Sequence, residues 1–320
     1  MEFLYFAVGL FLLFYGSSYI IDSSLAIAHK YSLNSVIAGL TLVALGTSAP
    51  ELAINISSNL KGVYDLAFSD VIGSSIFNNL LVLGSVLCFR PIVVNPRLLA
   101  REIPFGLVSG LMLFILANDS LFNSVSTNVL STGDGMIFLL VFAVFLWILA
   151  TYKEGFFEAQ YTTPKFGPVK ATVLFVAGVA LLGAGAYMLI DSVIALSDKL
   201  GVSQKFLGVS MVAFSTSAPE LMTAYLAIKR DEVALVFGNI IGSNIFNVLF
   251  ILGVSTMFGG MTFNATVLNL DLIFLILIKL LLLVSIIFAA KKYYLSRKTG
   301  FMFLALFVSY LAYLGYTLGI

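Results

Sequence analysis

The sequence has little of what soluble enzymes and zinc proteins use. Cys88 and His29 are the only cysteine and the only histidine, which excludes a disulfide framework, a Cys/His zinc site and any mechanism that needs two histidines. Charged side chains make up 10% of the 320 residues, whereas globular domains average about 25%. The formal net charge of +1 excludes nucleic acid as a partner, because phosphate binding needs a basic surface.

The sequence is instead rich in long apolar segments. Hydrophobic residues make up 60% of the chain and the mean hydropathy is +1.07, so we expect an all-α integral membrane protein. A transmembrane helix needs about 20 apolar residues. The predicted spans are 3–28, 34–60, 66–88, 98–117, 135–152, 170–197, 205–229, 233–257, 268–290 and 300–319.

The loop charges predict the orientation of these ten spans. The loops that join spans 1–2, 3–4, 5–6, 7–8 and 9–10 hold 13 lysines and arginines, and the opposite side holds three, Lys61, Lys199 and Lys205. Lysine and arginine concentrate in cytoplasmic loops. We therefore expect both termini to lie outside a cell (plasma) membrane, and Lys279, inside span nine, to pair or to reach the interface.

The chain contains two related halves, offset by 169 residues. GLTLVALGTSAPEL (39–52) aligns with GVSMVAFSTSAPEL (208–221), with nine of fourteen positions identical. The alignment continues from LAFSDVIGSSIFNNLLVLG (66–84) to LVFGNIIGSNIFNVLFILG (235–253). Internal repetition of this kind indicates a duplicated architecture.

Each half holds five predicted spans, an odd number, so the second half must enter the membrane upside down. We therefore predict a first inverted repeat over 1–152, a short cytoplasmic linker over 153–169 and a second repeat over 170–320. Inverted repeats with interrupted helices are typical of secondary transporters. Scaffolds and pores also arise by gene duplication and are the structural alternative.

The most informative motif is Thr-Ser-Ala-Pro-Glu, which ends at Glu51 and again at Glu220 inside apolar spans. Pro50 and Pro219 remove a backbone donor and should break each helix. A carboxylate at membrane depth is costly, so it normally faces a partner or a wet path. The candidate carbonyls that these breaks free are those of Ala44, Thr47, Ala213 and Thr216.

A second pair of polar stretches follows each motif. Asp70, Ser74 and Asn78 are spaced four residues apart and share one helix face, and Asn239, Ser243 and Asn247 repeat this spacing. Gly73 and Gly242 beside the serines allow close helix approach. The serines and the asparagines at 78 and 247 have the character of cation ligands, whereas residues 70 and 239 are expected nearer the mouths, behind the ligands or as a gate. Interhelical hydrogen bonding is the structural alternative.

Carboxylates, hydroxyls and carbonyls form an all-oxygen set, which suits hard cations such as Ca²⁺ and Na⁺. At these motifs the chain resembles the cation/Ca²⁺ exchanger superfamily, and within it the Na⁺/Ca²⁺ exchanger branch. The resemblance covers essentially the whole chain. It implies a metal site formed by spans two, three, seven and eight, with spans one and six as a sliding pair, and Ca²⁺ and Na⁺ as substrates. It implies no cofactor, no enzymatic activity and no obligate protein partner beyond the lipid bilayer.

The resemblance also assigns roles by position. Glu51 and Glu220 are the expected Ca²⁺ carboxylates, completed by the carbonyls of Thr47 and Thr216. The expected flanking Na⁺ ligands are Ser48, Ser217, Ser74, Ser243 and the carbonyls of Ala44 and Ala213, with Asn78 and Asn247 beside the centre.

The chain departs from the family pattern at a few positions. Asn247 stands where many microbial relatives have an aspartate, Ser69-Asp70 replaces Gly-Asn, Ser75 replaces an asparagine, and Ser215 stands where the first copy has Gly46. One hypothesis is that Asp70 attracts cations at the outer mouth. The motif favours Na⁺ coupling, and the alternatives are an H⁺- or K⁺-coupled antiporter of the same superfamily, a passive cation channel, and an intramembrane hydrolase that uses the paired carboxylates.

Overall fold

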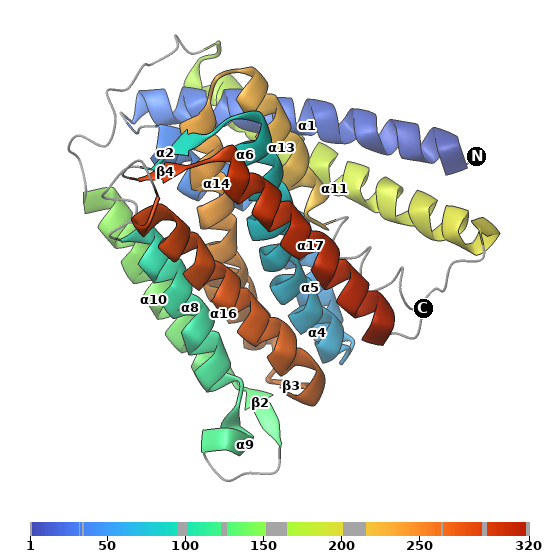
Figure 1. The fold of residues 1–320 in the computed structure, drawn as a ribbon. Coiled ribbons are helices and arrows are strands. Elements are labelled where there is room, and N and C mark those ends of the chain that lie inside the picture. Colours follow the sequence, from blue (N-terminus) through green and yellow to red (C-terminus); the bar gives the residue numbers. More distant parts are fainter. Residues whose placement is uncertain are drawn as a thin grey trace.

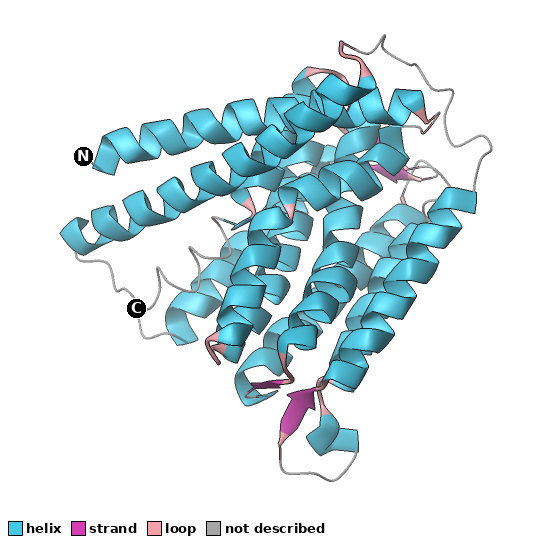
Figure 2. Ribbon diagram, turned by 180° about the vertical axis from the view of Figure 1, so that it is seen from behind, coloured by secondary structure: helices cyan, strands magenta, loops and turns pink. Residues whose placement is uncertain are grey.

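The computed structural model describes residues 2–31, 33, 35–94, 101–122, 127–151, 165–200, 216–263, 265–289 and 293–317. These residues form a helical bundle with two short strand pairs (Figures 1 and 2). The helices are α1 (Glu2–Lys30), α2 (Ser35–Ala38), η1 (Gly39–Val43), α3 (Ala44–Thr47), α4 (Ala49–Leu60), α5 (Tyr64–Phe77), η2 (Asn78–Val82), α6 (Leu83–Phe89), α8 (Glu102–Leu116), α9 (Asp119–Phe122), α10 (Thr132–Thr151), α11 (Pro168–Leu200), α13 (Ala218–Lys229), α14 (Val233–Ile245), η3 (Phe246–Ile251), α15 (Leu252–Ser255), η4 (Thr256–Phe258), α16 (Ala265–Ile287) and α17 (Arg297–Thr317). The strands are β1 (Ile92–Val93), β2 (Asn128–Leu130), β3 (Met261–Phe263) and β4 (Tyr294–Leu295).

The described residues confirm an all-helical, multi-pass membrane protein. Seven helical segments are long and apolar enough to cross a membrane, and the bent pair Ser35–Thr47 and Ala49–Leu60 makes eight. Two further predicted spans coincide with α8, which has 15 residues, and with α13, which is described only from Ala218. The prediction of ten spans therefore remains a prediction, because these two helices do not meet the length of a full crossing.

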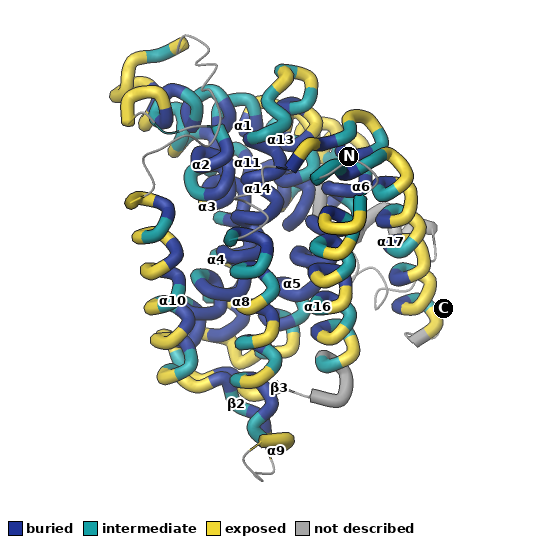
Figure 3. Tube along the Cα trace, turned by 60° about the vertical axis from the view of Figure 1, so that its left-hand side comes forward, coloured by how far each residue is buried: buried dark blue, intermediate teal, exposed yellow. Residues whose placement is uncertain are grey.

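The central helices are buried on all sides and the outer helices on one side. In Val233–Phe258 94% of the most apolar window is buried, against 28% in Thr132–Thr151. Apolar side chains on the outer helices, such as Phe3, Trp147 and Tyr316, are exposed, as expected for a lipid-facing surface. Figure 3 shows this gradient from α14 outward to α10 and α17.

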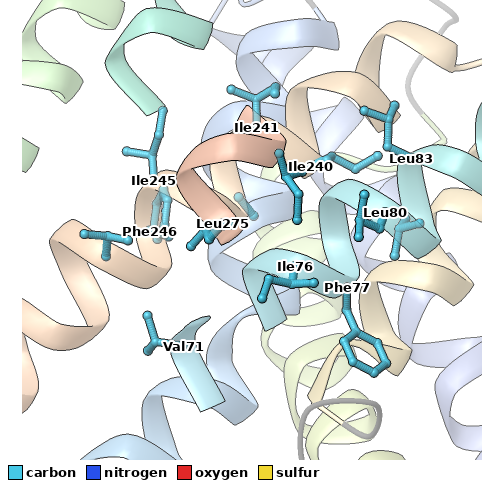
Figure 4. Packing of buried hydrophobic residues seen from close by; sticks show 14 of the residues in the cluster. Val71, Ile76, Phe77, Leu80, Leu83, Ile240, Ile241, Ile245, Phe246 and Leu275 are labelled. Atoms are coloured by element: carbon cyan, nitrogen blue, oxygen red, sulfur yellow. The ribbon is translucent and has the colours of Figure 1, made fainter. Parts of the chain in front are cut away.

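The core lies where α5, η2 and α6 meet α14 and η3 (Figure 4). Ile76, Leu80 and Ile240 are fully buried there. These helices carry apolar residues on nearly every face because they have no lipid-facing side.

Ion pairs gather several loops at one end of the bundle. Asp22 Oδ1 accepts hydrogen bonds from Lys165 Nζ (3.0 Å) and Arg230 Nη1 (2.9 Å), and Arg90 pairs with Asp231. These residues belong to α1 and to the connections after spans 3, 5 and 7. The predicted cytoplasmic loops therefore lie together, which is what alternating crossings require.

The opposite end is joined by different loops. Asn59 Nδ2 donates to the Gly259 carbonyl (3.0 Å), and Thr132 Oγ1 donates to the Thr256 carbonyl (3.2 Å). Strand β2 pairs with β3 at this end, whereas β1 pairs with β4 at the other (Figure 1). The connections after spans 2, 4 and 8 thus lie apart from the ion-paired loops.

Lys279 is buried between α16 and α8. Its Nζ donates to the Gly106 carbonyl at 2.9 Å, and only 4% of the residue is exposed. The lysine therefore pairs within the bundle, as one of its two predicted roles required, instead of extending to the interface.

Close backbone contact joins the first half of span two to α14. A Cβ at Gly39 would lie 2.3 Å from the Leu235 carbonyl oxygen, and one at Gly242 would lie 2.6 Å from the Leu40 carbonyl oxygen. The predicted packing role of Gly242 is confirmed. Because both neighbours are backbone atoms, neither contact can relax by a rotamer change.

We predict that Gly39→Ala lowers the free energy of unfolding by about 1–3 kcal/mol, because the added methyl group forces the two helices apart. The measurement is the midpoint of thermal unfolding in detergent, followed by size-exclusion chromatography. Gly183→Ala on α11 is the control, since a Cβ there meets no atom within 4 Å. Equal midpoints for the two variants would contradict this account of the packing.

Candidate cation site

Both Thr-Ser-Ala-Pro-Glu motifs interrupt a helix, as predicted. The breaks fall at Ser48 (φ −85°, ψ 8°) and Ser217 (φ −83°, ψ −3°), and each proline sits in the first turn of the helix that follows. Proline is favoured there because its fixed φ suits a first turn and its missing N–H is not needed. Glu51 and Glu220 consequently lie in the first turns of α4 and α13, where free N–H groups and the helix dipole favour a negative charge.

One of the candidate carbonyls is not released by the break. The Ala44 carbonyl accepts the Ser48 N–H at 2.9 Å, so the break does not free it. Proline deprives the carbonyl four residues earlier, which is that of Gly46 in the first motif. Ala213 lies outside the described residues.

The other predicted site residues are all buried. Glu51 and Glu220 are both 0% exposed, and none of the hydroxyl or amide side chains in the set exceeds 3%. Those residues are Thr47, Thr216, Ser48, Ser217, Ser74, Ser243, Asn78 and Asn247.

Glu220 accepts a hydrogen bond from one serine of each half of the chain. Ser48 Oγ donates to Glu220 Oε1 at 3.3 Å, and Ser243 Oγ donates to the same oxygen at 3.4 Å. Ser48 belongs to the first half of the chain and Glu220 to the second. The predicted ligands of spans two, seven and eight therefore share one site.

The hydroxyl of each motif threonine contacts a side chain from the other half of the chain. Thr47 Oγ1 donates to Asn239 Oδ1 (3.3 Å), and Thr216 Oγ1 donates to Asp70 Oδ1 (3.1 Å). Ser74 Oγ lies 3.0 Å from Thr216 Oγ1, which adds span three to the site. The sequence prediction gave these threonines a role through their carbonyls and missed this role of their hydroxyls.

Asp70 lies inside the bundle and not at an open mouth. Only 1% of the residue is exposed, and its Oδ2 accepts a hydrogen bond from Asn55 Nδ2 at 2.9 Å. Its bonds to Asn55 on α4 and to Thr216 put it behind the predicted ligands, one of the two positions that the sequence left open. Asn55 was missed entirely, although a buried amide four residues after Glu51 was the available signal.

Several polar atoms of this cluster have no hydrogen-bond partner among the residues that the structure describes. Both carboxylate oxygens of Glu51, Oε2 of Glu220 and all side-chain polar atoms of Asn78 and Asn247 form no hydrogen bond. Buried polar groups are nearly always paired, and an unpaired carboxylate in a low dielectric is especially costly. Their oxygens are suited to a hard cation.

Asn78 and Asn247 lie in π-helical turns. Helices η2 and η3 are π-helical turns that begin at Asn78 and Phe246, the latter one residue before Asn247. Such turns often mark functional sites, because they disturb the regular hydrogen-bond ladder. Among the residues that the structure describes, no three His, Cys, Asp or Glu side chains are placed to hold a metal ion by themselves. The site therefore depends on hydroxyl, amide and carbonyl oxygens as well as carboxylates.

Comparison with known proteins settles the family. The family model described as "Sodium/calcium exchanger protein" matches residues 1–151 and 170–316. The chain belongs to the sodium/calcium exchanger family. The predicted resemblance is thus confirmed, and the chain is a member of a family of transporters.

Individual relatives agree with this assignment. The chain is 31% identical over 312 residues to the putative antiporter CaxA of Alkalimonas amylolytica, covering 95% of each chain. It is 27% identical to the sodium/calcium exchanger MaX1 of Methanosarcina acetivorans, covering 99% of each. A structure of the sodium–calcium exchanger NCX_Mj matches with a TM-score of 0.80 and 29% identity, over 97% of this chain and 98% of that chain.

The unpaired carboxylate predicts an unusual effect on stability. Glu51→Gln should raise the thermal unfolding midpoint without Ca²⁺ by a few degrees, because it removes a buried charge with no protein partner. The same change should abolish the further rise that saturating Ca²⁺ gives the unmodified protein. The measurement is the unfolding midpoint in detergent with and without Ca²⁺.

Glu102→Gln is the matched control. Glu102 is also buried, with an unpartnered Oε2, but it lies on α8 beside Arg101. This variant should keep the stabilisation by Ca²⁺. Loss of the Ca²⁺ effect in both variants would show that the effect is not specific to this site.

Proposed function

We propose that this chain is a secondary active antiporter that exchanges Na⁺ for Ca²⁺ by alternating access. The observation that carries the proposal is the pair of buried glutamates, Glu51 and Glu220, in one cluster of oxygen donors from both halves of the chain. Ca²⁺ would bind between the glutamates and the threonine carbonyls. Na⁺ would bind at flanking positions built by Ser48, Ser217, Ser74 and Ser243.

The charge of the site explains why exchange would be obligatory. Among the described residues, no lysine or arginine forms an ion pair with Glu51 or Glu220. Two unpaired carboxylates cannot cross a low-dielectric barrier cheaply, but one Ca²⁺ or two to three Na⁺ offset their charge. Because both ions use overlapping oxygens, each crossing would carry one or the other.

Paired contacts support the proposed ten-span, inverted arrangement. With the offset of 169 residues, β1 corresponds in sequence to β3, and β2 corresponds to a segment just after β4. The observed pairs are β1 with β4 and β2 with β3. One pair lies at each end of the bundle. This is the exchange of partners that an inverted two-fold relation requires.

Helices α1 and α11 are the proposed sliding pair. They lie side by side and are inclined to α8, α10 and α16 (Figures 1 and 2). A Cβ at Gly16 would lie 3.1 Å from the Gly178 carbonyl oxygen, and one at Gly185 would lie 2.9 Å from that of Gly9. Small residues allow such close contact between membrane helices, so the two helices would move together as one body.

Transport in proteoliposomes tests the proposal. We expect ⁴⁵Ca²⁺ uptake by vesicles loaded with Na⁺, and none when K⁺ or a proton gradient replaces Na⁺. Loss of one buried carboxylate ligand costs on the order of 3 kcal/mol, so Glu51→Gln and Glu220→Gln should each lower uptake roughly a hundredfold. Glu102→Gln should transport normally.

Each of the other outcomes would indicate a different transport function. Uptake driven by K⁺ or by a proton gradient would replace Na⁺ coupling with one of the superfamily alternatives. Uptake without any counter-ion would indicate a passive channel.

A second experiment tests the stoichiometry that the family resemblance implies. Three Na⁺ leaving for one Ca²⁺ entering moves one positive charge outward. A vesicle interior made positive by an inward K⁺ gradient with valinomycin should therefore accelerate Ca²⁺ uptake, and a negative interior should slow it. Uptake that does not respond to voltage would establish an electroneutral ratio of two to one.

A further inference from the structure

The two halves of the site differ at one pair of neighbouring residues. In the first half Asp70 accepts a hydrogen bond from Asn55 at 2.9 Å. The residues at the same places in the second half are Asn239 and Ala224, each 169 positions later. The donor and the carboxylate are therefore present together in one half and absent together from the other, whereas the Thr-Ser-Ala-Pro-Glu motif is the same in both.

The carboxylate acts on the threonine that it contacts. Thr216 Oγ1 donates to Asp70 Oδ1 at 3.1 Å. The single hydrogen of the Thr47 hydroxyl has neutral acceptors within reach, which are the Val43 carbonyl at 3.1 Å, the Asn239 amide oxygen at 3.3 Å and the Ala44 carbonyl at 3.4 Å. Hydrogen bonds to a charged acceptor are roughly twice as strong as neutral ones. Because its hydrogen is committed to Asp70, the Thr216 hydroxyl is left with lone pairs for Ser74 or for a cation.

Asn55 keeps Asp70 in this position. It lies one turn after Glu51 on α4, so it connects the third carboxylate to the helix of the first. It is 0% exposed and its Oδ1 has no protein partner. An unpaired amide oxygen beside the carboxylate adds to the negative potential at this half of the site.

The two halves also face different ends of the bundle. Asp70, Asn55 and Ser74 lie on α4 and α5, which are joined at Lys61–Val63. Asn239 and Ser243 lie on α14, which is joined to α13 near Arg230. In the inverted arrangement these two connections are at opposite membrane faces.

We propose that Asp70, held by Asn55, makes the Ser74–Thr216 half a tighter subsite for a small monovalent cation such as Na⁺ than the Ser243–Thr47 half. The inference rests on the proposed function and adds to it that the two flanking Na⁺ positions are unequal. Asp70 is a positioning residue that also supplies a third negative charge. The inequality favours Na⁺ entry from the face that carries Lys61–Val63.

The test measures the Na⁺ concentration that half-saturates Ca²⁺ exchange, separately at each face of oriented membrane vesicles. For Asp70→Asn we expect at least roughly a tenfold increase at the Lys61–Val63 face, which is the effect of one unit charge about 12 Å away at an effective dielectric of about 20, and little change at the Arg230 face. A change in Ca²⁺ affinity should show no such sidedness, because Ca²⁺ is expected between the glutamates.

The matched variant transfers the pair to the other half. Ala224→Asn combined with Asn239→Asp should lower half-saturating Na⁺ at the Arg230 face. An unchanged value in Asp70→Asn, or an equal shift at both faces, would overturn the inference. All of these substitutions are small, and the thermal midpoint of each variant shows whether it folds.

A binding measurement separates this inference from the proposed function. The Na⁺ dependence of the unfolding midpoint in detergent, without transport, should shift to higher Na⁺ in Asp70→Asn and not in Glu102→Gln. If the unmodified protein shows no Na⁺-driven Ca²⁺ flux, the proposed function fails, and this shift still decides the role of Asp70. If Na⁺ binding is the same with and without the carboxylate, the inference fails and the exchange function stands.

Discussion

The structure depends on one costly feature, two glutamates buried in a membrane protein. Among the described residues, no cationic side chain forms an ion pair with either of them. A carboxylate in this position is tolerated only when other groups of the protein or a bound cation offset its charge. The surrounding structure supplies partial compensation, because each glutamate lies in the first turn of a helix and Glu220 accepts two serine hydroxyls. Glu51 receives none of these hydrogen bonds. The protein therefore offsets only part of the charge of Glu51 and Glu220, and the remaining negative charge is suited to a cation that binds reversibly.

The same requirement explains the architecture around the glutamates. A helix start in the middle of a membrane needs a break, and the break exposes backbone groups that only a polar interior can accommodate. Two broken helices facing each other solve this problem together, since the hydroxyls of one half bond the polar groups of the other. The central helices α5 and α14 then have to be buried on all sides, and the lipid-facing surface passes to α1, α10, α16 and α17. Close glycine contacts between α14 and the first half of span two allow this crowding.

Much of this could be predicted from the sequence, because its main signals are local. Hydropathy, the repeated motif and proline chemistry predict a helical membrane protein with two broken helices and the site residues that lie there. Other features depend on which helices become neighbours. The hydrogen bonds of Thr47 to Asn239 and Thr216 to Asp70 join residues 192 and 146 positions apart, and no spacing rule predicts them. The partners of Asp70 could not be predicted for the same reason, since its distance from the helix end says nothing of the side chains that lie next to it. Ala44 was a wrong candidate for a simpler reason, because counting four residues back from Pro50 leads to Gly46.

An inverted repeat gives a transporter two equivalent conformations, but it does not require two equivalent binding sites. In the proposed mechanism the parts that move need this symmetry, and the proposed moving helices α1 and α11 have reciprocal glycine contacts. The oxygen ligands are free to differ, because an ion binds only one arrangement at a time. A carboxylate at position 70 with an amide at 239 changes the local potential without changing the packing, since Asp and Asn have nearly the same shape. In the proposed exchanger the asymmetry therefore lies in charge and the symmetry in shape, so that the face from which Na⁺ enters could be adjusted without a change in the motion that carries it across.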